Sequence, residues 1–174
     1  FKVYEMGVEH AVPDFREGPT LSERECAAAI AFGMEVVAEG ADIIALGNAG
    51  TGSATAAAAI ALALYGGTAD YWAGAHNHQA KERIKAVDQA VRAYDLSSTE
   101  PLQYLRNYGG RDIAGMVGAI IAARIQSIPV ILDGFVVCAA AAILHAIDPQ
   151  SIDHCRAGTL TCEPAHEALL DRMG

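Results

Sequence analysis

The chain has 174 residues, of which 52% are hydrophobic and 19% charged, a composition typical of one folded domain and not of a disordered chain. Its net charge of −9 is spread along the sequence, without the large basic cluster that neutralises nucleic-acid phosphates, so we expect no DNA or RNA partner. No apolar run reaches the roughly 18 to 20 uninterrupted residues of a membrane span, so no membrane contact is expected either.

The chain begins at Phe1, and the residues after it lack the charged start and apolar middle of a signal peptide. We therefore expect a single domain over 1–174 that forms the core of a longer cytoplasmic chain. The cysteines show no C-x-x-C spacing, which favours reduced, partly buried thiols over the alternative of a disulfide or metal role. They are Cys26, Cys138, Cys155 and Cys162.

The first half of the chain alternates between short apolar runs and longer helical patterns. Residues 1–8 contain β-forming residues and end near a glycine, which predicts a short strand. Residues 20–37 predict a helix whose capping box is Thr20 with Glu23. Residues 42–47, DIIALG, are typical of a buried strand, and residues 53–65 predict a helix that is apolar on all sides and covered on every face.

The second half continues the same alternation. Residues 79–95 carry charges between apolar positions at helical spacing, which predicts an amphipathic surface helix, and residues 128–135, IPVILDGF, predict a second buried strand. We predict further helices at 98–110, 111–126, 136–147 and 163–173 and a weaker strand at 154–160.

Strands that alternate with helices of this length predict an α/β fold with a parallel sheet of Rossmann-like type and helices on both faces. In such sheets ligands bind beyond the carboxyl ends of the strands. The candidate site residues are therefore those that follow each strand, at 47–53, 133–135 and 158–163.

The loop G-N-A-G-T-G-S that follows the first buried strand is the leading candidate for ligand binding. Its amides and the start of the next helix would favour an anion such as phosphate. The spacing does not fit the G-x-G-x-x-G fingerprint, and the Lys-Ser/Thr pair of the P-loop is missing, so those two modes of nucleotide binding are disfavoured. Alternatively, the glycines serve only a tight strand-to-helix turn.

Each of the other polar residues near the strand ends has two possible roles. Asp133, at the end of a strand expected to be buried, either holds a helix N-terminus or touches substrate. Glu163 caps the last helix, or alternatively Thr161 and the N–H groups around it receive a phosphate. The basic residues of 81–85 form a solvated helix face, unless one of them reaches the site to neutralise an anion.

His76 and His78 lie two residues apart, and no third ligand is within reach by sequence. We therefore interpret them as part of a solvated loop and expect no metal site. The remaining histidines have no pattern that distinguishes them from core or surface residues.

Four blocks of the sequence together resemble one family, the nicotinate-nucleotide:dimethylbenzimidazole phosphoribosyltransferases. In chain order they are DFREGPTLSERECAAAIAFGMEVV, GADIIALGNAGTGSATAAAAIALAL, GGRDIAGMVGAIIAARIQSIPVILDGF and, as a looser match, GTLTCEPAH. The corresponding family patterns include D-F-x-x-G-P-x-M-S-x-E-x-A and G-E-M-G-I-G-N-T-T. The resemblance covers most of the chain.

The resemblance implies transfer of a phosphoribosyl group from nicotinate mononucleotide to 5,6-dimethylbenzimidazole or a related base, without a metal or other cofactor. It also implies a homodimer and a parallel α/β fold, with a small helical lobe that is largely absent from these 174 residues. Lys85 or Arg83 would take the place of a family lysine. The substrate-binding residues implied are Gly47, Asn48, Gly50, Gly52, Ser53, Lys85, Asp133, Thr161 and Glu163.

The chain also departs from the family pattern. Asn48 stands where the family has an acidic residue, Ser53 begins the segment that is Asn-Thr-Thr in the family, and GGFE has become GGRD. The family's general base is a glutamate in a segment beyond Gly174, so no catalytic residue is assigned here. Two alternatives remain: a non-catalytic nucleotide- or base-binding relative, and an unrelated α/β protein whose glycine turn is only structural.

Overall fold

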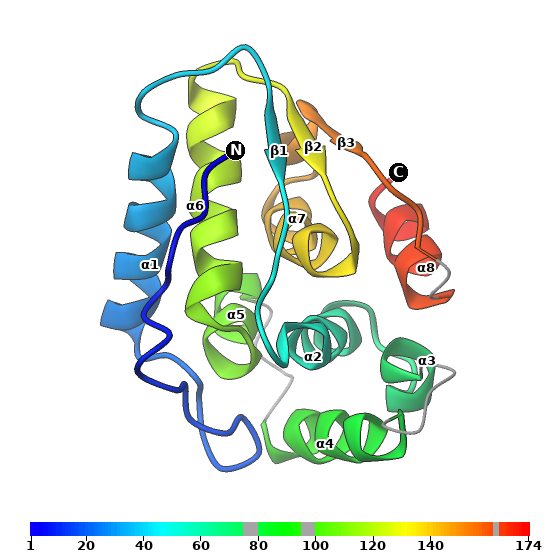
Figure 1. The fold of residues 1–174 in the computed structure, drawn as a ribbon. Coiled ribbons are helices and arrows are strands. Elements are labelled where there is room, and N and C mark those ends of the chain that lie inside the picture. Colours follow the sequence, from blue (N-terminus) through cyan, green and yellow to red (C-terminus); the bar gives the residue numbers. More distant parts are fainter. Residues whose placement is uncertain (75–79, 95–99, 162–163) are drawn as a thin grey trace.

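A computed structural model describes residues 1–74, 80–94, 100–161 and 164–174. The elements succeed one another along the chain as Figure 1 shows them. Their bounds are α1 Glu23–Val36, β1 Ile44–Leu46, α2 Ser53–Tyr65, α3 Ala69–Ala73, α4 Ala80–Ala93, α5 Pro101–Tyr108, α6 Arg111–Ile125, β2 Val130–Leu132, α7 Phe135–Ile147, the 3-10 helix η1 Pro149–Ile152, β3 Cys155–Ala157 and α8 Pro164–Met173.

The three strands form a parallel sheet in the order β1-β2-β3. Ile44 pairs with Val130, and Val130 in turn pairs with Cys155, so the three strands are in register from their first residues. Helices connect each strand to the next. The prediction of an α/β fold with a parallel sheet flanked by helices is therefore confirmed.

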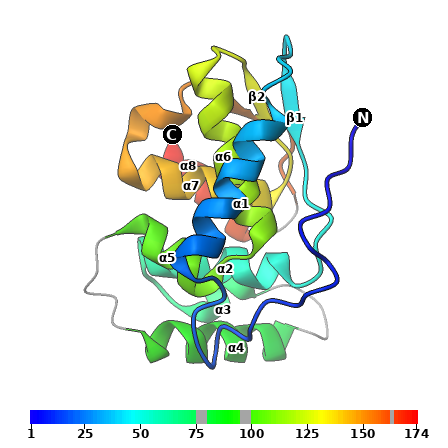
Figure 2. The same ribbon diagram turned by 90° about the vertical axis from the view of Figure 1, so that its left-hand side faces the viewer.

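The side chains of the strands alternate between two faces of the sheet. Val130, Leu132 and Cys155 are buried on the inner face, on the side where Figure 2 shows α6 and α7. Ala45 and Arg156 point the other way and are exposed. This alternation follows from the two-residue period of a strand.

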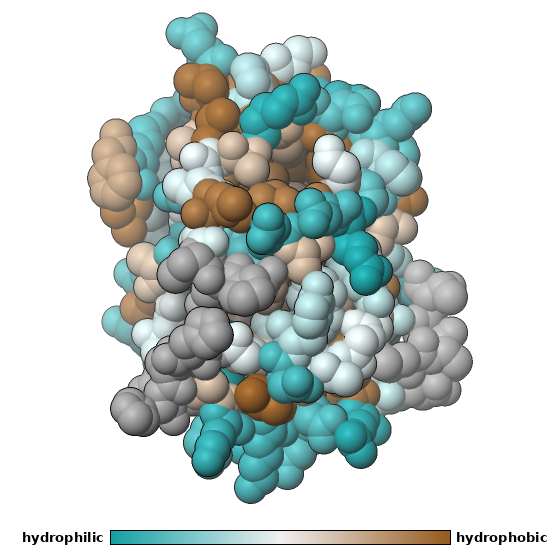
Figure 3. Space-filling model, turned by 90° about the vertical axis from the view of Figure 1, so that its right-hand side faces the viewer, coloured by the Kyte–Doolittle hydropathy of each residue, from teal (hydrophilic) through white to brown (hydrophobic). Residues whose placement is uncertain are grey.

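Alanine-rich helices form the centre of the molecule. Residues 57–61 of α2 and 137–143 of α7 are fully buried. This confirms the prediction that α2 is covered on all sides, and the same holds for α7. By contrast, α4 buries only one side, through Val87, Ala90 and Val91. Its charged side makes the lower end of the molecule hydrophilic in Figure 3, as expected of an amphipathic surface helix.

Three local predictions were wrong or incomplete. Residues 1–8 form no strand, and their backbone is held in part by the Arg111 guanidinium, which donates to the carbonyl of Gly7 at 3.2 Å. The capping box of α1 is Ser22 with Glu25, whereas the hydroxyl of Thr20 donates to the carbonyl of Arg106 at 2.9 Å. The short helices α3 and η1 were not predicted.

No helix in the described parts of the chain combines the length and the apolar character needed to cross a membrane. The described cysteines, Cys26, Cys138 and Cys155, are free and buried. This agrees with the prediction of reduced, buried thiols, while Cys162 lies outside the described residues.

We expect these three thiols to be unreactive in the folded protein. Burial raises the pKa of Cys138 to about 12 and that of Cys155 to about 11, and it also raises the pKa of Cys26. Since the thiolate is the reactive form, a Cys162→Ser variant should react very slowly with a disulfide reagent near neutral pH. Denaturant should then release three reactive thiols, and rapid labelling of the folded variant would contradict the burial.

Candidate functional site

Two helices begin directly after strands at the carboxyl edge of the sheet. α2 follows β1 through the loop 47–52, and α7 follows β2 through Asp133 and Gly134. The residues before the helices, Gly52 and Gly134, have φ of 82° and 87°, a left-handed conformation that favours glycine. Within the described residues, no side chain caps either helix, so their first amides remain available to an anion.

Asp112, in the first turn of α6, joins the two ends of the glycine loop. Its Oδ2 atom accepts a hydrogen bond from the Asn48 side-chain amide at 2.7 Å and another from the Ser53 hydroxyl at 2.6 Å. The Oδ1 atom of Asn48 in turn accepts from the backbone N–H of Gly50 at 3.0 Å. The interpretation of the sequence missed Asp112, although the GGRD segment that carries it had been singled out.

Two glycines leave room for this carboxylate. A Cβ atom on Gly50 would lie 2.3 Å from the Ser53 Oγ and 2.6 Å from the Asp112 Oδ2. A Cβ atom on Gly110 would lie 2.5 Å from the Asp112 Oδ1. All three distances are far below van der Waals contact, so a side chain at either position would displace the carboxylate or its partners.

A cavity of about 530 Å³ opens beside this network. The loop and α2 contribute Gly52 and Ser53 to its lining, α6 contributes Asp112, and α4 contributes Arg83. The N-terminal segment 12–16 forms another part of the wall. Residues distant in sequence thus meet at one hollow near the end of β1.

Arg111, next to Asp112, holds the N-terminal segment that leads into this wall. Its Nη1 atom donates to the carbonyl of His10 at 2.6 Å as well as to that of Gly7. Further along, Arg16 donates to Asp14 through its Nε atom at 2.9 Å. Hydrogen bonds from Arg16 lower the pKa of Asp14 to about 2, so this wall residue is ionised at neutral pH.

Two arginines, Arg16 and Arg83, line the cavity, and Arg16 is paired with Asp14. Within the described parts of the chain, Arg83 is not paired in this way. Its Nε atom is buried and has no hydrogen-bond partner among the described residues. Lys85, to which the sequence analysis assigned substrate binding, is exposed and is not part of the cavity lining. The two residues are two positions apart on α4, so they point to different sides of that helix.

Asp133 lies between the loops that follow β1 and β3. Its Oδ1 atom accepts from the Thr159 hydroxyl at 2.8 Å, and its Oδ2 atom would lie 4.0 Å from a Cβ atom on Gly47. The carboxylate is exposed, contrary to the expectation of a buried charge at this strand end. It therefore needs no helix N-terminus to offset burial.

A buried histidine orders the loop after β3. The His166 side chain is fully buried, and its Nδ1 atom accepts from the backbone N–H of Thr161 at 3.2 Å. The proton of the neutral ring then lies on Nε2, which is 3.3 Å from the Cys138 Sγ. Thr161 is thus tied to the core at its backbone. Glu163 and the pair His76 and His78 lie outside the described residues.

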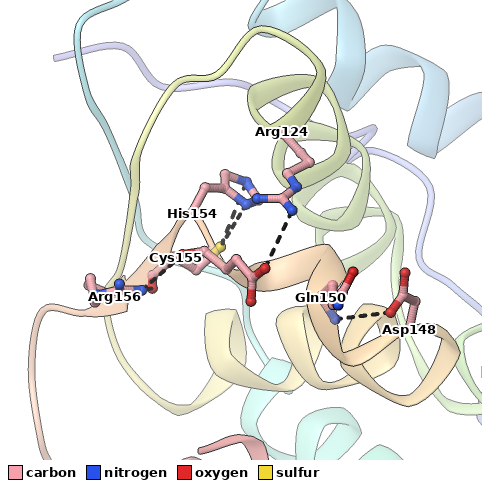
Figure 4. Close-up of polar contacts among 7 residues, drawn as sticks. Arg124, Asp148, Gln150, His154, Cys155 and Arg156 are labelled. Carbon is pink, nitrogen blue, oxygen red and sulfur yellow. Dashed lines mark hydrogen bonds and ion pairs between the residues drawn. The ribbon is translucent and has the colours of Figure 1, made fainter.

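A second hollow, of about 430 Å³, lies at the opposite edge of the sheet and includes Arg124 and His154 (Figure 4). Arg124 makes a 3.5 Å contact with Asp153, and the Nε2 atom of His154 lies 3.0 Å from the carbonyl of Ile120. Burial lowers the pKa of His154, which favours its neutral form. Arg124 and His154 thus each have a partner within the protein, and the hollow lies at the edge of the sheet opposite the glycine loop.

Known proteins share both the sequence and the fold. A family model described as phosphoribosyltransferase matches residues 1–174. The nicotinate-nucleotide–dimethylbenzimidazole phosphoribosyltransferases of Brucella anthropi and Brucella melitensis are each 49% identical to this chain over 177 aligned positions, which cover 99% of the chain and 52% of each relative. The chain therefore spans about half the length of these relatives.

A solved structure agrees with the sequence match. The crystal structure of the corresponding enzyme from Thermus thermophilus superposes with a TM-score of 0.86 at 29% identity, over 94% of this chain and 50% of that one. The match over the whole chain and the shared fold lead to one conclusion: the chain belongs to the phosphoribosyltransferase family represented by these proteins.

Proposed function

We propose that the protein transfers the phosphoribosyl group of nicotinate mononucleotide to 5,6-dimethylbenzimidazole or a related base, in synthesis of the lower ligand of cobamides. The observation that supports this most is the cavity at the carboxyl edge of the sheet, where the start of α2, the Asp112 network and Arg83 meet. The names of the family relatives supply the substrates.

In this reaction a benzimidazole nitrogen attacks the anomeric carbon of the ribose. The bond from that carbon to the nicotinate nitrogen breaks, nicotinate leaves, and the other benzimidazole nitrogen gives up its proton. The uncapped amides at the start of α2 suit the phosphate, and the Arg83 guanidinium suits either the phosphate or the nicotinate carboxylate. The contribution of these groups is to position the substrates and stabilise charge.

We also propose that Gly47, Asn48, Gly50, Gly52 and Ser53 contact the nucleotide. Thr161 and Asp133 would lie beside it on the strand-end loops, and we propose Glu163 as a further contact. For the cation we propose Arg83 in place of Lys85, because Arg83 lines the cavity. A cytoplasmic homodimer that needs no metal completes the proposal.

The test is to incubate the full-length protein with nicotinate mononucleotide and dimethylbenzimidazole and to separate the products by liquid chromatography. We expect nicotinate and an α-linked ribotide in equal amounts. Calorimetry with nicotinate mononucleotide alone separates the alternatives. Binding without turnover with any base would indicate a non-catalytic relative, whereas absence of both binding and turnover would contradict the nucleotide site itself.

A further inference from the structure

We propose that Asp112 is the positioning residue of the nucleotide site and that its pairing with Asn48 sets the shape of the loop 47–53. This assignment rests on the proposed function, because the loop is the part of the site that would hold the nucleotide. It concerns a residue that contacts the loop side chains and acts on the ligand through them.

The hydrogen bonds form a continuous chain across the loop. The Gly50 N–H bonds to Asn48, Asn48 bonds to Asp112, and Ser53 bonds to the same Asp112 oxygen. Asn48 lies near the end of β1 and Ser53 begins α2, so the carboxylate fixes the loop at both ends. Since α6 is a separate helix, the loop is held in place from outside itself.

The chain of bonds also determines what the loop can offer to a ligand. The single hydroxyl proton of Ser53 points to Asp112, so its oxygen can only accept a hydrogen bond from a ligand. Asn48 uses one amide proton on Asp112 and its oxygen on Gly50, which leaves it one N–H donor. The loop therefore presents defined donors and acceptors only while the carboxylate keeps its two partners.

A carboxylate is well suited to this position. Asp112 lies in the first turn of α6, where the positive end of the helix dipole favours a negative charge. Two donors that converge on one oxygen are bound more strongly by a charged acceptor than by a neutral one. The amide at position 48 is its complement, because an aspartate there would place a second carboxylate within hydrogen-bond distance of the first.

The test exchanges the side-chain amide of Asn48 and the carboxylate of Asp112 between the two positions. Calorimetry measures the affinity of each variant for nicotinate mononucleotide. In Asn48→Asp two carboxylates face each other, and we expect affinity to fall by about tenfold or more at neutral pH and to recover partly at lower pH, where the pair shares one proton. The double variant Asn48→Asp/Asp112→Asn restores one amide and one carboxylate. We expect its affinity to return to within about threefold of wild type, as a restored pair predicts.

Asp153→Asn, a carboxylate-to-amide change at the far edge of the sheet, is the matched control and should bind like wild type. Thermal midpoints measured on all variants show whether a loss of affinity comes from a loss of folding. The assignment is overturned if Asn48→Asp binds normally, if its affinity does not depend on pH, or if the double variant binds no better than Asn48→Asp. A wild-type protein that fails to bind the nucleotide overturns the proposed function, and the assignment with it.

Discussion

Gly50→Val should weaken nicotinate mononucleotide binding by about 30-fold or more, equivalent to roughly 2 kcal/mol, while the protein stays folded. The Cβ atom of any side chain at position 50 would overlap the Ser53 Oγ and the Asp112 Oδ2. The smallest rearrangement that relieves this overlap is a rotation of the Ser53 side chain, which breaks its hydrogen bond to Asp112. Since Gly50 is exposed, little core packing depends on it, and the damage should stay within the loop.

The matched variant for this prediction is Gly18→Val, at a glycine that is not part of the cavity lining. No heavy atom lies within 4 Å of a Cβ added at this position. We therefore expect a clearly smaller change in affinity than at Gly50. Calorimetry measures both dissociation constants, and circular dichroism with a thermal scan checks the fold. Equal effects at the two positions, or wild-type affinity in Gly50→Val, would show that the loop geometry does not govern binding.

The location of the candidate site could be predicted from sequence because it follows from local patterns. The apolar run that ends at Leu46 and the helical run that begins at Ser53 place the glycine loop at the end of a strand. A parallel sheet then places its ligands at that edge. The same reasoning placed Asp133 correctly at the end of β2 but overestimated its burial, because sequence alone does not show how far the loops cover a strand end.

Asp112 could not be predicted in the same way. It is 64 residues from Asn48 and 59 from Ser53, and only the packing of α6 beside the loop brings them together. The sequence does contain a signal for it, since a carboxylate in the first turn of a helix that follows two glycines has a short, unobstructed path to a neighbouring loop. Tertiary contacts of this kind have no periodicity that a sequence pattern can reveal.

The choice between Arg83 and Lys85 shows a different limit. Both residues lie on one predicted helix, and the resemblance to the family left either possible. The rotation of the helix about its axis decides which one faces the cavity, and this rotation is set by the buried side chains Val87, Ala90 and Val91. The wrong prediction of a strand at residues 1–8 also reflects tertiary structure that the sequence does not show. β-forming residues make a strand only if a neighbouring strand pairs with them.

The largest effect on stability is expected where α1 packs against α6, the two helices that lie side by side in Figures 1 and 2. A Cβ atom on Gly33 of α1 would lie 1.8 Å from the carbonyl oxygen of Gly115, and one on Gly118 of α6 would lie 1.9 Å from that of Ile30. Backbone atoms cannot rotate away as side chains do. An alanine at either position therefore forces the helices apart.

Two opposing effects determine how Gly118→Ala changes the free energy of unfolding. Alanine favours a helix over glycine by about 1 kcal/mol, but overpacking a close backbone contact costs typically about 1–3 kcal/mol and occasionally more. Because the added Cβ would overlap main-chain atoms of Ile30 in α1, we expect the cost of overpacking to exceed the gain in helix propensity. The free energy of unfolding should then fall by about 2 kcal/mol, which lowers Tm by roughly 4–8 °C in a chain of this size.

Gly115→Ala, one turn earlier in α6, is the control, since its Cβ would meet mainly the flexible end of Met6. That variant should be neutral or slightly stabilised, because only helix propensity then remains. Urea unfolding of both variants measures the difference, and equal stabilities would mean that α1 and α6 do not approach each other at the backbone in solution.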